Sequence, residues 1–62
     1  MDPCTQHNIG RGLYLHPFPH DATRYIQCDA WPGYYYVRNC PGGTVFDARN
    51  GVCNYGYYYY GK

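Results

Sequence analysis

The chain has 62 residues, of which 45% are hydrophobic and 21% aromatic, and it carries 4 Cys and 10 Tyr. So short a chain forms one domain with a marginal core, and its cysteines are therefore expected to form structural disulfides in a secreted, extracellular protein. A net charge of +1 with scattered Arg excludes a basic face for nucleic acid, and no apolar run approaches the ~20 residues of a membrane span.

The N-terminal third, residues 4–20, is predicted to be irregular. Gly10 and Gly12 interrupt any helical period, and Pro17 and Pro19 hold the residues before them in extended conformations. No window repeats apolar positions at the helical spacing of three and four. We therefore expect no helix and one short strand near Leu13.

Four extended runs follow, and they are predicted to form two hairpins. Residues 25–29 and 34–40 suit a pleated surface and are separated by a Pro-Gly turn. Residues 44–46 and 52–55 make a second, smaller pair, joined through an Asn-Gly dipeptide that readily supplies positive φ. The Tyr- and Gly-rich tail, residues 56–62, is too biased in composition for a structural prediction.

Four cysteines allow three disulfide pairings, and the spacing alone does not choose among them. Pairing Cys40 with Cys53 is favoured because these residues flank the second hairpin, which brings its ends close together. That choice leaves Cys4 to pair with Cys28. Closure of the Cys40 to Cys53 loop would contribute about 3 kcal/mol in the chain-entropy model.

A zinc site is the competing interpretation of the N-terminal cysteine. Cys4 and His7 could act as a two-ligand pair, with His16 and His20 nearby. However, the chain has no C-x2-C pair, which such sites usually require. We therefore expect no metal and no other cofactor.

The aromatic residues are too many for so small a core, so many rings must be exposed, and exposed rings at this density indicate a binding face. Side chains alternate along a strand, so Tyr34 and Tyr36 share one face. These two rings and Trp31 are predicted to stack on the flat faces of sugar rings, because aromatic side chains offer contact area with little loss of entropy. The aromatic residues assigned to the core are Tyr14, Tyr25, Tyr35 and Phe46.

Catalysis is not expected. Acid–base glycoside cleavage needs two carboxylates held across a cleft. The chain has no Glu, and its only carboxylates are four scattered Asp side chains. It also lacks Ser, and oxidised cysteines cannot act as nucleophiles. The protein is therefore predicted not to be an enzyme.

An ordered set of residues resembles the peritrophin-A type (type 2) of chitin-binding domain over residues 4–55. The set is Cys4, Gly12-Leu13-Tyr14, Pro17, Pro19, Tyr25-Ile26-Gln27-Cys28, Cys40-Pro41-Gly42-Gly43-Thr44-Val45-Phe46-Asp47 and Cys53. The resemblance implies a small all-β extracellular module that binds chitin without cleaving it. It also implies a three-stranded antiparallel sheet followed by a two-stranded hairpin, arranged as a distorted β-sandwich.

The chain departs from that family in having four cysteines, where six are usual. The second family cysteine would fall at Ala22 and the sixth would follow Cys53, so both halves of one bridge are missing. The remaining pairs implied by the resemblance are Cys4 with Cys28 and Cys40 with Cys53.

The resemblance also places sugar contacts on the second hairpin and near the end of the domain. Carried over by position, it implies Asp47 and Asn54 as polar contacts and Tyr55 and Tyr57 as stacking rings. The whole chain is read as one module, with its core in residues 4–55 and a tail in residues 56–62.

We expect the partner to be chitin or its oligosaccharides, and we expect binding neither to nucleic acid nor to a membrane. The protein is expected to be a monomer or a module of a larger secreted protein. The alternative is a tyrosine-rich extracellular matrix protein that assembles through its C-terminal tail.

Overall fold

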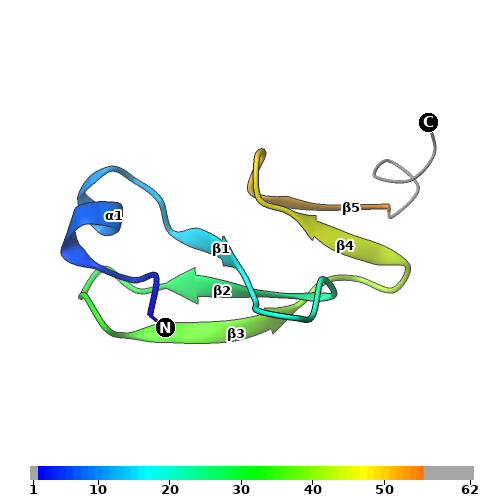
Figure 1. The fold of residues 1–62 in the computed structure, drawn as a ribbon, viewed down its shortest axis with the longest axis horizontal. Coiled ribbons are helices and arrows are strands. Elements are labelled where there is room, and N and C mark those ends of the chain that lie inside the picture. Colours follow the sequence, from blue (N-terminus) through cyan, green and yellow to red (C-terminus); the bar gives the residue numbers. More distant parts are fainter. Residues whose placement is uncertain (1, 56–62) are drawn as a thin grey trace.

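The computed structural model describes residues 2–55, which form two antiparallel sheets and one short helix (Figure 1). The first sheet has the strand order β1-β2-β3, and the second is the hairpin β4-β5. The strands are β1 (Leu15–Pro17), β2 (Arg24–Cys28), β3 (Tyr35–Asn39), β4 (Thr44–Asp47) and β5 (Val52–Tyr55). The predicted fold class is confirmed. The first strand begins two residues later than expected.

The prediction of no helix was wrong, because α1 spans Gln6–Gly10. The Thr5 side chain caps its start by accepting a hydrogen bond from the backbone N–H of Asn8. The chain leaves the helix through Gly12, whose φ is 78°, and the Leu13 N–H donates to the Asn8 carbonyl at 2.9 Å. A five-residue helix is too short to show a hydrophobic period, so the Thr cap was the only available signal.

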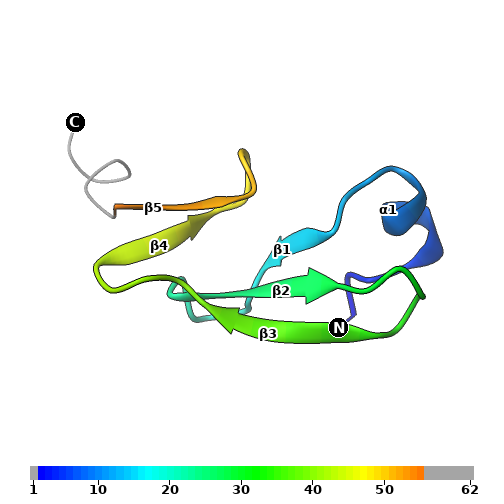
Figure 2. The same cartoon turned by 180° about the vertical axis from the view of Figure 1, so that it is seen from behind.

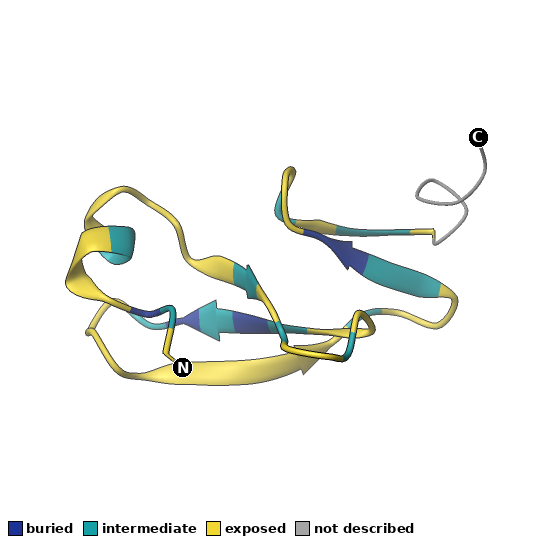
Figure 3. Cartoon of the chain, viewed as in Figure 1, coloured by how far each residue is buried: buried dark blue, intermediate teal, exposed yellow. Residues whose placement is uncertain are grey.

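The main core lies between β2 and the N-terminal segment. Its buried members are Cys4, Ile26 and Cys28, and the partly buried Ile9 and Phe18 pack against them. Figure 3 shows buried segments in dark blue on β2. Ile26 and Cys28 point to the same face of β2 because side chains alternate along a strand. The Cys4–Cys28 disulfide is therefore part of the packed core as well as a covalent link.

A ring pair joins the hairpin to the first sheet. The Tyr25 and Phe46 rings stack with their centroids 5.1 Å apart, and the Phe46 N–H donates to the Ala22 carbonyl at 2.8 Å. Figure 2 shows this hairpin at the opposite end of the three-stranded sheet from α1. Phe46 is buried and Tyr25 is half-buried, as expected of core aromatics.

Two other predicted core rings are exposed, so their assignment was wrong. Tyr35 is 46% exposed because it lies on β3, the edge strand, where no described element covers it. Tyr14 is 39% exposed because it lies just before β1, the opposite edge strand. Their sequence positions suited a core, but edge strands leave part of each side chain in water.

Both predicted disulfides are present, Cys4–Cys28 and Cys40–Cys53. The Cys4 sulfur is therefore not available as a thiolate ligand, which removes the basis of the zinc interpretation. Within residues 2–55, no grouping of three or more His, Cys or Asp side chains could hold a metal ion. The same residues include no helix long and apolar enough to cross a membrane. The tail, residues 56–62, lies outside the described residues.

Candidate carbohydrate-binding site

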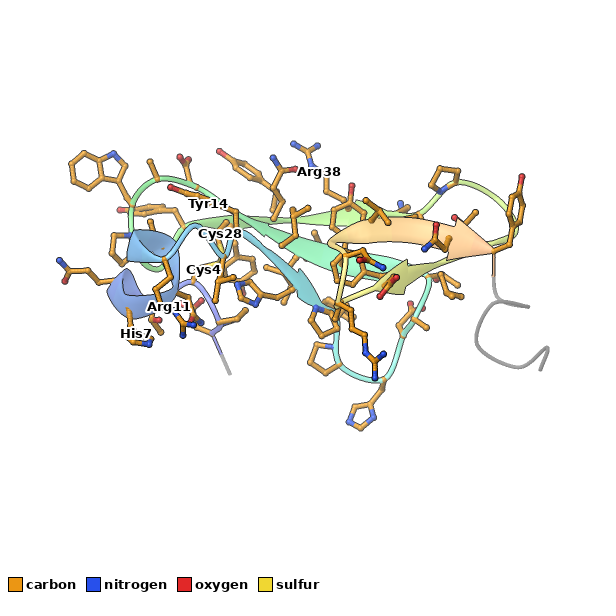
Figure 4. The ribbon with its side chains drawn as sticks, turned by 90° about the horizontal axis from the view of Figure 1, so that it is seen from above. Cys4, His7, Arg11, Tyr14, Cys28 and Arg38 are labelled. Atoms are coloured by element: carbon orange, nitrogen blue, oxygen red, sulfur yellow. A yellow bond between two sulfur atoms is a disulfide. The ribbon has the colours of Figure 1, made fainter. Side chains whose placement is uncertain are left out.

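The register of the first sheet separates its side chains onto two faces. Ile26 lies opposite Val37 on the face that carries the core, and Gln27 lies opposite Tyr36 on the other face. Figure 4 shows Arg38 projecting from the side of the sheet opposite to Cys4 and Cys28. We call this second surface the polar–aromatic face. Its polar and exposed aromatic members are Gln27, Asp29, Tyr34, Tyr36 and Arg38. Tyr25, in register with Arg38, lies on the same face by alternation, but its ring stacks on Phe46 of the hairpin.

Side-chain contacts fix the polar–aromatic face. The Tyr36 hydroxyl donates to Asp29 Oδ2 at 3.3 Å, and the Arg38 guanidinium carbon lies 5.4 Å from the centroid of the Tyr36 ring. Arg38 Nε also donates to Gln27 Oε1 at 3.0 Å. Tyr36 is thus held between an anion at its hydroxyl and a cation against its ring, which restricts its rotamers.

Trp31 and Tyr34 lie on the turn between β2 and β3, and they are the most exposed of the large hydrophobic residues described, at 71% and 66%. The turn itself is held by backbone bonds, because Tyr34 N–H donates to the Trp31 carbonyl and Gly33 N–H donates to the Cys4 carbonyl. Gly33 supplies a φ of 87° that most L residues avoid. The two rings are therefore carried on a defined backbone.

Asp47 has a different environment from the one expected of a ligand contact. It is only 8% exposed, and its carboxylate accepts bonds from Asn50 Nδ2, Asn54 Nδ2 and the Arg49 backbone N–H at 2.7, 3.2 and 3.0 Å. The Asn50 amide is the largest cause holding the pKa of Asp47 below its ordinary value, and burial acts in the opposite direction. Asp47 and Asn54 thus organise the β4–β5 turn.

The last predicted contacts lie at the end of the hairpin. Tyr55 is 54% exposed and is paired with Thr44 across the hairpin. Its ring passes Gly43, where a side chain would meet Tyr55 Cε1 at 3.9 Å. Tyr57 lies outside the described residues. The predicted residues therefore divide into a group on the first sheet and its turn, and a group on the hairpin.

A groove lies where the β4–β5 turn meets the segment that leads into β1. It has a volume of about 370 Å³ and is lined by Gly12, Leu13, Tyr14, Leu15, Ala48, Arg49, Asn50 and Gly51. Leu15 is in register with Gln27, so the groove borders the polar–aromatic face. The sequence interpretation missed this groove, and it also missed Gln27, Asp29 and Arg38. Alternation along residues 25–29 and 34–40 could have placed those three beside Tyr36.

Comparison with known proteins is consistent with this architecture. The family model for the chitin binding Peritrophin-A domain matches residues 4–60. No curated protein and no solved structure shows a significant match. The match spans nearly the whole chain and includes both disulfides, both sheets and the polar–aromatic face. The chain belongs to the chitin-binding peritrophin-A domain family.

Proposed function

We propose that this domain binds chitin without cleaving it, through Trp31 and the polar–aromatic face. The observation that carries the proposal is the exposure of Trp31 and Tyr34 beside polar side chains that are already fixed. The rings of Trp31 and Tyr34 would stack on the C–H faces of N-acetylglucosamine units. Aromatic rings lose little conformational entropy on binding, so such stacking favours association.

Tyr36 would act differently from these two rings. Its hydroxyl is bonded to Asp29 and Arg38 lies against its ring, so one side of the ring is already occupied. We assign Tyr36 to orienting its neighbours and to lateral contact with the sugar. The Arg38 guanidinium has five N–H donors, and its Nη groups can donate to acetamido or hydroxyl oxygens. The Asp29 carboxylate can accept bonds from sugar hydroxyls.

On the hairpin, we assign Asp47 and Asn54 to holding the β4–β5 turn, and Tyr55 to a secondary stacking contact. The three bonds at the Asp47 carboxylate support the first assignment. The 54% exposure of Tyr55 supports the second. Tyr57 remains a candidate stacking residue by its position in the sequence.

The four Asp carboxylates stabilise local turns, which supports binding without hydrolysis. Each carboxylate accepts a backbone N–H from a residue one or two positions further along the chain, which is a local turn-stabilising role. The four residues that do this are Asp2, Asp21, Asp29 and Asp47. Two disulfides in so short a chain support a secreted, extracellular location.

Retention on insoluble chitin tests the proposal, with cellulose as the control polymer. We expect the oxidised wild type to be retained on chitin, and Trp31→Ala and Tyr34→Ala each to weaken binding about tenfold, equivalent to about 1.4 kcal/mol. Tyr35→Ala is the matched control. It removes the same side chain from the neighbouring position, which faces the other side of the sheet, and it should leave binding unchanged.

Two results would contradict the proposal. If the folded wild type washes through chitin, the domain does not bind this polymer under the conditions used. If Tyr55→Ala abolishes retention while Trp31→Ala has no effect, the site lies on the hairpin instead.

A further inference from the structure

The outer edge of β3 carries backbone groups that have no partner within residues 2–55. At the two ends of this strand, Asp29 N–H donates to the Tyr34 carbonyl and Cys40 N–H donates to the Thr23 carbonyl. Even-numbered residues of this segment therefore direct their backbone groups toward β2. Directions alternate along an antiparallel ladder, so the odd-numbered residues direct theirs outward. These outward-directed residues are Tyr35, Val37 and Asn39.

This edge has few of the features that usually block pairing. β3 contains no Pro and no Lys, it pairs with β2 without a bulge, and all five of its residues are exposed (Figure 3). In Figure 1 no described element lies outside β3. The strand is therefore accessible to another extended chain.

We propose that a second copy of this chain pairs with β3 in antiparallel orientation, centred on Val37. In this register Val37 of one copy lies opposite Val37 of the other, and Tyr35 lies opposite Asn39. These are the residues whose backbone groups point outward, so each pair can exchange two hydrogen bonds. The edge is thus complementary to itself.

The two neighbouring registers of this strand pair are less favourable. Moving the centre to Tyr36 would pair Asn39 with Gly33, which has a φ of 87° and lies in the turn. Moving it to Arg38 would set the two guanidinium groups opposite each other and pair Tyr35 with Pro41, which has no N–H. The Val37 register uses the whole strand and avoids both conflicts.

Side-chain pairing across the two copies also favours the Val37 register. Tyr36 of each copy would lie opposite Arg38 of the other, in a non-hydrogen-bonded pair where side chains approach closely. This repeats between copies the contact of 5.4 Å that Arg38 already makes with Tyr36 in one chain. A cation against an aromatic ring is favourable, and the symmetry supplies the contact twice.

The pairing would give one sheet in the order β1-β2-β3-β3-β2-β1. The two-fold axis of such a pair is perpendicular to the sheet, so both polar–aromatic faces point the same way. The outer edge of β1 has only three residues and ends at Pro17, which disfavours further growth. The assembly would stop at a dimer with a doubled binding surface.

A contact made by one short strand from each copy is smaller than a standard stable interface, so the dimer would be weak in dilute solution. Binding to a polymer raises the local concentration and would favour it there. The pairing itself does not depend on the proposed function, because it can be measured without chitin.

Sedimentation of the full oxidised chain from micromolar to millimolar concentration tests the inference. We expect the average mass of the wild type to rise toward that of a dimer, and Val37→Pro to abolish the rise. The Val37 N–H points outward, so Pro there removes no bond to β2. Val37→Thr, which keeps the N–H, is the matched control and should associate as the wild type does.

Two further measurements make the result decisive. If Val37→Pro fails to fold, a synthetic chain with an N-methyl group on Val37 replaces it. This group removes the same hydrogen-bond donor without fixing φ, and we expect the N-methyl chain to stay monomeric. In a mixture of differently labelled copies, we expect an intermolecular contact between the α-protons of Tyr36 and Arg38. Three results would each overturn the inference. The average mass of the wild type could be independent of concentration, or the N-methyl chain could associate as the wild type does. The intermolecular contacts could also fall on residues 57–60 and not on β3.

Discussion

The three-stranded sheet and the β4–β5 hairpin use their polar and aromatic side chains in opposite ways. On the hairpin, Asp47 is buried and bonded to Asn50 and Asn54, so these polar groups hold the turn. On the turn that joins β2 and β3 of the sheet, Trp31 and Tyr34 remain exposed to solvent. Asp47 belongs to the family motif and yet stabilises the fold, whereas Trp31 and Tyr34 lie outside that motif and are exposed.

The largest expected effect comes from removing one disulfide at a time. Replacing Cys4 and Cys28 by Ser removes two of the three residues of the main buried cluster, so we expect loss of the fold and of chitin binding. Chain entropy alone accounts for about 3 kcal/mol, a large share of the stability of so small a domain. Circular dichroism and chitin retention measure the two losses.

Replacing Cys40 and Cys53 by Ser is the matched comparison. A two-stranded hairpin is marginal alone, so the hairpin should loosen, while the first sheet and its polar–aromatic face persist. Amide exchange should be faster in β4 and β5 than in β2. If chitin retention is lost with the sheet still folded, the hairpin carries the binding.

A smaller effect is expected from adding a methyl group at the turn glycines. Gly33 and Gly51 both have positive φ, so Gly→Ala at either position should lower the free energy of unfolding by about 1 kcal/mol. Only Gly33→Ala should also weaken chitin binding, because Gly33 lies between Trp31 and Tyr34. Gly42→Ala is the control, since its φ is not positive and a Cβ there meets nothing within 4 Å. Equal binding losses at Gly33 and Gly51 would contradict this division of roles.

The smallest effect is a pH dependence located in the hairpin. The pKa of Asp47 is lowered in the folded state, chiefly by the Asn50 amide, so its ionised form stabilises the fold. This contribution is present above the unfolded-state pKa, about 4, and is lost as the pH falls through the lower folded-state value. Asp47→Asn should reduce the loss of stability on acidification, measured by denaturant unfolding.

Asp21 provides the reference for that experiment. Its pKa is also lowered, first by the Thr23 hydroxyl, so part of the acid sensitivity should survive in Asp47→Asn. Amide exchange at low pH should locate the Asp47 part in β4 and β5. An unchanged pH profile in Asp47→Asn would show that the carboxylate contributes nothing through its charge.

The sequence predicted the strands because their signals are local. Extended runs bounded by Gly and Pro located both ends of β2 to β5 to within one residue, and Cys40 and Cys53 flank a short hairpin. The short helix was missed, since one turn shows no period and depends on the Thr5 cap. Trp31 and Tyr34 were correctly expected to be exposed, because a small core cannot enclose so many rings.

The amino-acid sequence by itself determined the family, the all-β class and the favoured disulfide pairs. Only the tertiary structure decided which rings are covered and which carboxylate is buried. Tyr25 and Tyr35 look alike in sequence, yet Tyr25 stacks on Phe46 and Tyr35 lies on an open edge. The reason is physical: alternation and turn residues act locally, whereas burial depends on which distant segment packs against a strand.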